Sequence, residues 1–71
     1  MAEDVRAHIT GVVFKIVAGA GSTVAAGEPI LILESMKMEI PVEAPRAGIV
    51  RELRVSEGQT VQEGEVVATL E

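Results

Sequence analysis

The stretch GSTVAAGEPILILE, residues 21–34, returns in altered form as GQTVQEGEVVATLE, residues 58–71, at the end of the chain. Extended at the same offset of 37 residues, the match covers residues 1–34 and 38–71 without a gap, with 12 identical pairs in 34. Six of the seven glycines fall into pairs, so the turns of the two halves coincide. The chain is therefore an internal repeat whose halves are joined by three residues, 35–37.

The apolar residues of the repeat are of the kind found in β-sheets. Eleven valines and six isoleucines make up half of the hydrophobic residues, and glycines and other turn-formers separate short apolar segments. Strands are predicted at residues 12–17, 30–34, 39–42, 49–55 and 66–70, and no stretch sustains a helical period. We expect an all-β fold in which each half supplies about four short strands and the halves pack face to face over one core.

A pseudo-twofold relation between the halves predicts where the chain ends and the junction lie. Residue 34 corresponds to residue 71, and residue 38 corresponds to residue 1. Because residues 34 and 38 are close along the chain, residues 71 and 1 should be neighbours at the symmetry-related place. The chain ends should therefore meet at one end of the domain, while residues 35–37 form a hairpin tip at the other.

Length and composition restrict the function. The chain is expected to be one domain, residues 1–71, too small for a deep enclosed active site. It has no cysteine and a single histidine, His8, so we expect neither a thiol nucleophile nor a zinc site. The net charge of -5 and the single phenylalanine argue against nucleic-acid binding, and the longest apolar run, residues 29–33, is too short to cross a membrane. We expect a soluble, cytoplasmic protein.

The junction has an unusual composition for a turn. Residues 34–39, ESMKME, contain no Gly, Asn, Asp or Pro, although two-residue hairpins usually recruit such residues to reach a positive φ. A local rule broken where the two halves meet points to a functional site. Two interpretations of Met36 and Met38 stay open: anchors that hold the turn against the core, or adaptable apolar surface for recognition.

Residues 34–40, ESMKMEI, closely resemble the attachment motif of the biotinyl domain, the biotin carboxyl carrier module of biotin-dependent carboxylases. The resemblance implies the biotinyl/lipoyl hammerhead fold, a flattened β-barrel or sandwich of two four-stranded antiparallel sheets with quasi-twofold symmetry. It also implies that Lys37 receives biotin through an amide on its Nζ, with Met36 and Met38 as flanking recognition residues. Ser35 stands where the family more often has alanine, and the loop over residues 18–27 is too short for the thumb insertion of some members.

The same resemblance implies a carrier rather than an enzyme. A biotin protein ligase would biotinylate Lys37, and the biotin arm would shuttle a carboxyl group from biotin carboxylase to a carboxyltransferase, with the domain itself a monomer. Two alternatives stay open: a lipoyl-carrier domain, whose lysine usually follows Asp and precedes Ala, and an unmodified interaction module. A catalytic lysine is disfavoured, because such lysines are buried or lie beside cations, whereas the neighbours Glu34 and Glu39 are anions.

Overall fold

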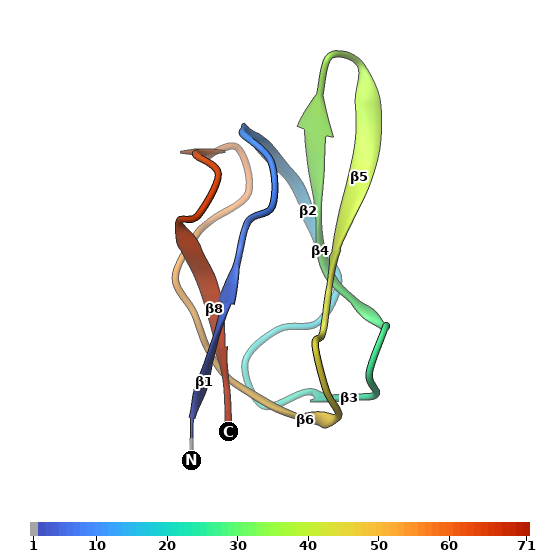
Figure 1. Cartoon of the computed structure of the whole chain (residues 1–71), viewed down its shortest axis with the longest axis vertical. Coiled ribbons are helices and arrows are strands. Elements are labelled where there is room, and N and C mark those ends of the chain that lie inside the picture. The colour runs from blue at the N-terminus through green and yellow to red at the C-terminus, as the bar shows by residue number, and fades with distance from the viewer. Residues whose placement is uncertain (1) are drawn as a thin grey trace.

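Eight β-strands and no helix make up residues 2–71, the part of the chain that the computed structural model describes. The strands are β1 Glu3–Arg6, β2 Gly11–Ile16, β3 Thr23–Val24, β4 Pro29–Ser35, β5 Met38–Glu43, β6 Gly48–Leu53, β7 Thr60–Val61 and β8 Val66–Leu70. They form two four-stranded antiparallel sheets, in the orders β1-β8-β6-β3 and β5-β4-β2-β7 (Figure 1), which confirms the predicted fold class. Nowhere in residues 2–71 is there a helix long and apolar enough to cross a membrane.

The two halves of the repeat are interleaved, so the expectation that they pack face to face was wrong. Each sheet takes two strands from each half. The reason lies at the junction: β4 continues into β5 through only two residues, so the last strand of the first half must pair with the first strand of the second. The repeat places β1 beside β8 in the same way, with Glu3 opposite Leu70 where Ile40 lies opposite Leu33. Met1, which matches Met38 in the repeat, lies outside the described residues.

The offset of 37 residues also holds for the hydrogen bonds of the turns. The N–H groups of Gly21 and Gly58 donate to the carbonyl oxygens of Val50 and Val13, each at 2.7 Å. These glycines have φ angles of 91° and 90°, a left-handed conformation that strains any residue with a Cβ. These two glycines are therefore equivalent turn positions in the structure, whereas the paired Gly11 and Gly48 are the first residues of β2 and β6.

The core lies between the two sheets and consists of aliphatic side chains. Leu33 of β4 and Leu70 of β8 are equivalent in the repeat, and neither has any exposed surface. Within residues 2–71, the only buried polar side chain is Thr69, whose hydroxyl has no hydrogen-bond partner. Because each sheet contains strands of both halves, the two halves share this one core.

The molecule is elongated, 33 × 17 × 17 Å, and the hairpin of β4 and β5 lies at the end opposite both chain ends (Figure 1). Arg46 holds the chain ends together. Its Nε donates to Glu3 Oε1 at 2.8 Å, and its Nη1 donates to the carbonyl oxygen of Glu71 at 3.2 Å. The predicted placement of the hairpin is confirmed, and Glu3 and Glu71 lie close together as expected, while residue 1 itself lies outside the described residues.

Candidate functional site

The hairpin of β4 and β5 carries the predicted attachment motif at its tip. The last residue pair of the two strands is Ser35 opposite Met38, and Met36 and Lys37 form the turn between them. Ser35 belongs to β4, so the turn has two residues rather than the predicted three. Met36 and Lys37 have φ angles of 52° and 65°, and positive values at both positions are typical of a type I′ turn, whose twist matches that of the strands.

The turn forces two long side chains into a conformation that glycine and asparagine adopt more easily. A left-handed backbone costs an ordinary L residue about 1–2 kcal/mol relative to the right-handed one. Met36 and Lys37 both carry this strain. Backbone strain of this kind concentrates at functional sites, where side-chain identity matters more than stability. The turn is therefore a functional candidate on its geometry as well as on its sequence.

Replacing Met36 by asparagine is expected to stabilise the protein. Asparagine tolerates the left-handed region, so Met36→Asn should raise the free energy of unfolding by about 0.5–1 kcal/mol. Urea denaturation followed by circular dichroism measures the change. Met38→Asn is the matched control, because Met38 is also exposed but lies in β5, and it should bring no gain. Destabilisation by Met36→Asn would contradict the assignment of strain to this turn.

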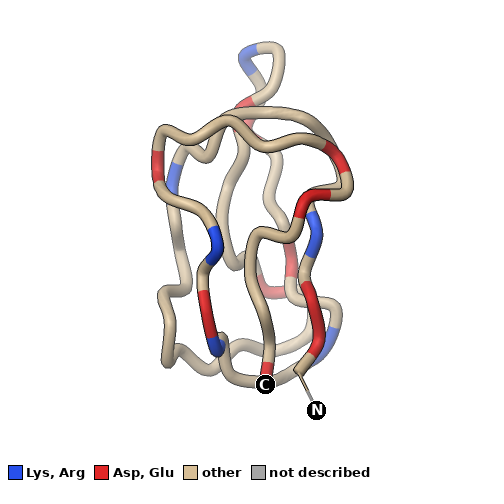
Figure 2. The backbone as a smooth tube through the Cα atoms, turned by 90° about the vertical axis from the view of Figure 1, so that its left-hand side faces the viewer, with Lys and Arg blue, Asp and Glu red and all other residues tan. Residues whose placement is uncertain are grey.

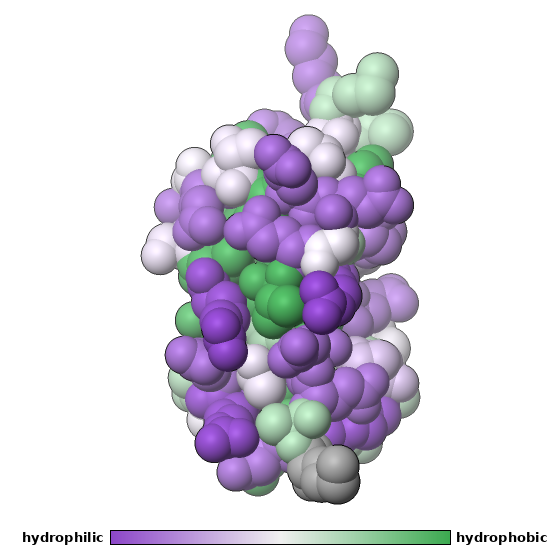
Figure 3. Space-filling view, turned by 60° about the vertical axis from the view of Figure 1, so that its left-hand side comes forward, coloured by the Kyte–Doolittle hydropathy of each residue, from purple (hydrophilic) through white to green (hydrophobic). Residues whose placement is uncertain are grey.

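The tip stands clear of the rest of its sheet (Figure 3). Towards the hairpin, the pairing of β2 with β4 ends at Val12, which lies opposite Glu34. Lys37 is exposed, Met36 is 90% exposed and Met38 is 58% exposed. Since neither methionine is buried in the core, the structure favours the interpretation of exposed apolar surface over that of anchors.

No ion pair within residues 2–71 involves the amine of Lys37. Among residues 2–71 the ion pairs join Arg6 to Asp4, Arg46 to Glu3 and Arg54 to Glu52, and none involves the hairpin. Glu34 and Glu39 lie opposite each other near the base of the tip, and both are exposed. The site is thus an exposed primary amine with two nearby anions. Such a lysine is suited to be modified rather than to act as a base or an imine-forming catalyst.

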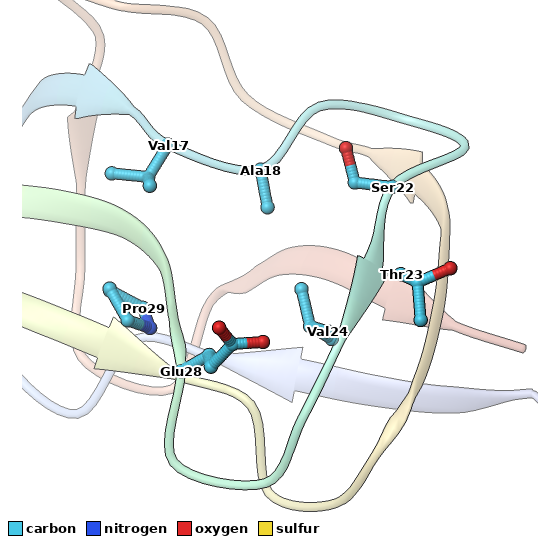
Figure 4. Close-up of a pocket in the computed structure, with 7 residues that line it drawn as sticks. All are labelled: Val17, Ala18, Ser22, Thr23, Val24, Glu28 and Pro29. Carbon is cyan, nitrogen blue, oxygen red and sulfur yellow. The ribbon is translucent and has the colours of Figure 1, made fainter.

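A hollow of about 340 Å³ lies beside β3, at the end of the molecule away from the hairpin (Figure 4). Its lining consists of Val17, Ala18, Ser22, Thr23, Val24, Glu28 and Pro29. The carboxylate of Glu28 is already used in the fold, because its Oε1 accepts a hydrogen bond of 2.6 Å from the N–H of Ala25. Residues 2–71 contain no group of three potential metal-ligating side chains, and His8 is exposed. The chemistry of the described residues therefore centres on the hairpin.

Comparison with known proteins assigns the chain to a family. The model of a family described as "Biotin-requiring enzyme" matches residues 1–70. The chain belongs to this biotin/lipoyl family. The biotinylated protein TB7.3 homolog of Mycobacterium leprae (strain TN) is 47% identical over 70 residues, which are 99% of this chain and 99% of that protein. The biotin carboxyl carrier protein of Streptococcus mutans is 39% identical over 69 residues, 97% of this chain and 53% of that protein.

A solved structure shares the fold of this biotin/lipoyl family member. The urea carboxylase of Kluyveromyces lactis matches with a TM-score of 0.93 and 36% identity, over 99% of this chain and 6% of that chain. The chain therefore spans almost the whole of one relative, about half of another and a small part of the carboxylase. The predicted biotinyl/lipoyl fold is confirmed. The lipoyl alternative is not better supported, since both named relatives carry biotin in their names.

Proposed function

We propose that Lys37 is the residue to which biotin is attached. The observation that carries the proposal is its position: an exposed amine in a two-residue turn, at the end of the molecule opposite both chain ends. An acceptor lysine must offer a primary amine that is accessible and free of ion pairs, and in the described part of the chain Lys37 meets both needs. The other lysine, Lys15, lies within β2 opposite Ile32, so it does not project from the end of the molecule as a turn residue does. Met36 and Met38 would form the apolar surface that partner proteins recognise beside it.

The protein is a biotin carboxyl carrier domain, and it provides a support rather than catalytic groups. When attached, biotin supplies a ureido ring that accepts a carboxyl group at one active site and yields it at another. The chain holds the Lys37 nitrogen at the end of a paired hairpin, which limits the directions that the arm explores. It also raises the effective concentration of the arm at each site, since the arm stays bound to the domain.

The attachment step would depend on a biotin protein ligase. The Lys37 nitrogen must lose a proton and form an amide with the carboxyl carbon of biotinyl adenylate, while the bond from that carbon to the phosphate oxygen breaks and AMP leaves. The neighbouring side chains Glu34 and Glu39 are exposed and offer no buried base. The ligase therefore has to bring biotin in an activated form and to take up the proton, while this chain supplies only the positioned amine.

Biotin carboxylase and carboxyltransferase components are the proposed partners of the loaded domain. Two solved relatives, the urea carboxylase and a single-chain, multi-domain long-chain acyl-CoA carboxylase, contain this fold as 6% and 7% of their chains. In the present domain the chain ends lie away from the tip, so the tip can enter one active site and then another (Figure 1). The choice of carboxyl acceptor would rest with the carboxyltransferase, because the tip itself is convex and exposed.

Intact mass spectrometry tests the proposal. The purified chain, incubated with a biotin protein ligase, biotin, ATP and Mg²⁺, should gain the mass of one biotinyl group. A parallel reaction with a lipoate ligase and lipoate is the control. Addition of a lipoyl group and no biotin would contradict the proposal in favour of a lipoyl carrier. No addition in either reaction would favour an unmodified interaction module.

A further inference from the structure

The outer surface of the hairpin's own sheet carries apolar side chains that the core does not use. We define the Phe14 face by its outward residues on β2, β4 and β5: Val12, Phe14, Ile32 and Pro41. In β2, Val13 is 1% exposed and faces the core, whereas Val12 on one side is 38% exposed. Phe14, the extra residue of the irregularity in β2, is 51% exposed. Contiguous exposed apolar residues on a small protein usually mark an interaction site.

The internal repeat supplies a control for this face. The residues equivalent to the Phe14 face on the other sheet are Ile49, Arg51, Thr69 and Asp4. That side of the molecule carries two exposed ion pairs, Arg6–Asp4 at 3.7 Å and Arg54–Glu52 at 3.3 Å, and charged residues line β6 and β1 on either side of β8 (Figure 2). Hydrophilic residues surround only a small apolar patch on that side of the molecule (Figure 3). Val12 and its equivalent Ile49 are both apolar and exposed, at 38% and 45%. The two outer surfaces differ at the other three positions, which are apolar only on the sheet that carries Lys37.

The Phe14 face is continuous with the tip. Val12 lies opposite Glu34, three residues before Lys37, and Lys15 lies opposite Ile32, five residues before it. At a strand rise of about 3.3 Å per residue, the face begins about 10 Å below the turn. A protein surface that encloses the tip would therefore extend over Val12 and Phe14.

The length of the Lys37 side chain, with or without biotin, decides which partner must contact the tip and the Phe14 face directly. Before modification, Lys37 reaches out only by its own four-carbon stem, so an enzyme that acylates the nitrogen must close around the tip itself. After modification the arm is longer by the whole of biotin, and later partners can act from a greater distance. The requirement for close contact is thus strongest for the biotin protein ligase.

The charges around the Phe14 face indicate which kind of partner surface is complementary to it. Glu34, Glu39 and Glu43 are exposed on β4 and β5, and Lys15 is the one basic residue among the exposed residues of β2, β4 and β5. The formal net charge of the chain is -5. A complementary partner has an apolar centre flanked by basic side chains.

We propose that the Phe14 face is a docking surface for the biotin protein ligase, through an apolar ligase patch with a basic rim. This inference rests on the proposed attachment at Lys37. Docking through the face brings the tip into the ligase active site, so it governs how tightly the unmodified domain is bound. Once the domain is bound to the ligase, the chemical step at the Lys37 amine does not depend on the Phe14 face.

Biotinylation kinetics of the full chain test the inference. The double variant Val12→Thr/Phe14→Ser should raise KM and lower kcat/KM about tenfold or more, with kcat nearly unchanged. The matched control is the equivalent pair on the other sheet, Ile49→Thr/Arg51→Ser, which should stay within about twofold of the unsubstituted chain. Thermal melting of both variants checks folding. If the double variant melts at a lower temperature than the control, the biotinylation kinetics of the single variant Phe14→Ser are compared with those of the control instead.

Several outcomes would overturn the inference. An unchanged kcat/KM in the double variant, or an equal loss in both variants, removes the face from ligase binding. Sedimentation that finds the unsubstituted chain dimeric, and the double variant monomeric, assigns the face to a second copy instead. A lack of biotin on the unsubstituted chain refutes the attachment at Lys37 and this inference together. The first three outcomes leave that attachment intact, so the two failures are distinguishable.

Discussion

The Lys37→Arg variant is expected to take up no biotin from a biotin protein ligase, whereas the unsubstituted chain is modified to completion. Arginine keeps the positive charge and the approximate length of the side chain, so the turn and its surroundings are preserved. The guanidinium group stays protonated and does not form the amide that a lysine nitrogen forms. The expected effect is therefore a complete loss of modification without a loss of fold. Intact mass and a streptavidin blot after the ligase reaction measure it.

The second lysine provides the control for this result. The chain has only two lysines, and Lys15 is exposed in β2. Lys15→Arg should be biotinylated at the rate of the unsubstituted chain, because the ligase acts at the turn. Biotin on Lys15 in the Lys37→Arg variant would contradict the assignment, since it would mean that exposure alone selects the lysine. Urea denaturation of both variants should give the same midpoint as the unsubstituted chain.

The repeat made much of the fold predictable from the sequence. Because the offset of 37 residues has no gap, it fixes which turns are equivalent, and Gly21 and Gly58 indeed make the same hydrogen bond in each half. It also placed the chain ends and the hairpin at opposite ends. It did not reveal which strands share a sheet, since equivalence between halves says nothing about pairing between them. That information lay in the two-residue connection between β4 and β5, which forces the halves to exchange strands.

The site itself was predictable in position but not in geometry. The absence of turn-formers in residues 34–39 marked the junction as unusual. The structure adds that Met36 and Lys37 both accept a left-handed conformation, so the anomaly in sequence is a strain in the backbone. The Phe14 face was missed, because an apolar residue in a strand is ordinarily assigned to the core. The available signal was the mismatch of Phe14 with Arg51 in the repeat, since equivalent core positions keep their apolar character.

Shortening a core leucine is expected to remove a large part of the stability of the domain. Leu70 of β8 has no exposed surface and lies between Glu3 of β1 and Val50 of β6. Leu70→Ala loses buried apolar surface and leaves a cavity, at a cost of about 2–5 kcal/mol. A domain of this length has about 4–11 kcal/mol of stability in all. The melting temperature should therefore fall by at least about 10 °C.

Leu33 allows the same substitution to be made in the other sheet. It is equivalent to Leu70 in the repeat and is also fully buried, so Leu33→Ala should destabilise the protein to within about 1 kcal/mol of Leu70→Ala. Because the chain has neither Trp nor Tyr, far-ultraviolet circular dichroism in urea is the suitable measurement. Ile49→Ala, at a position that is 45% exposed, is the surface control and should cost less than about 1 kcal/mol.

The comparison of the two leucines bears on how the attachment site is held. Leu33 lies four residues before Lys37 in the strand that leads to the turn, whereas Leu70 lies next to the chain end. A much smaller loss for Leu33→Ala would mean that the sheet under Lys37 is supported less firmly than its counterpart, contrary to one shared core. Equal losses would mean that both sheets depend on the same packing. The rigidity of the turn would then be a property of the whole interleaved domain, and substitutions near the chain ends would loosen the tip as well.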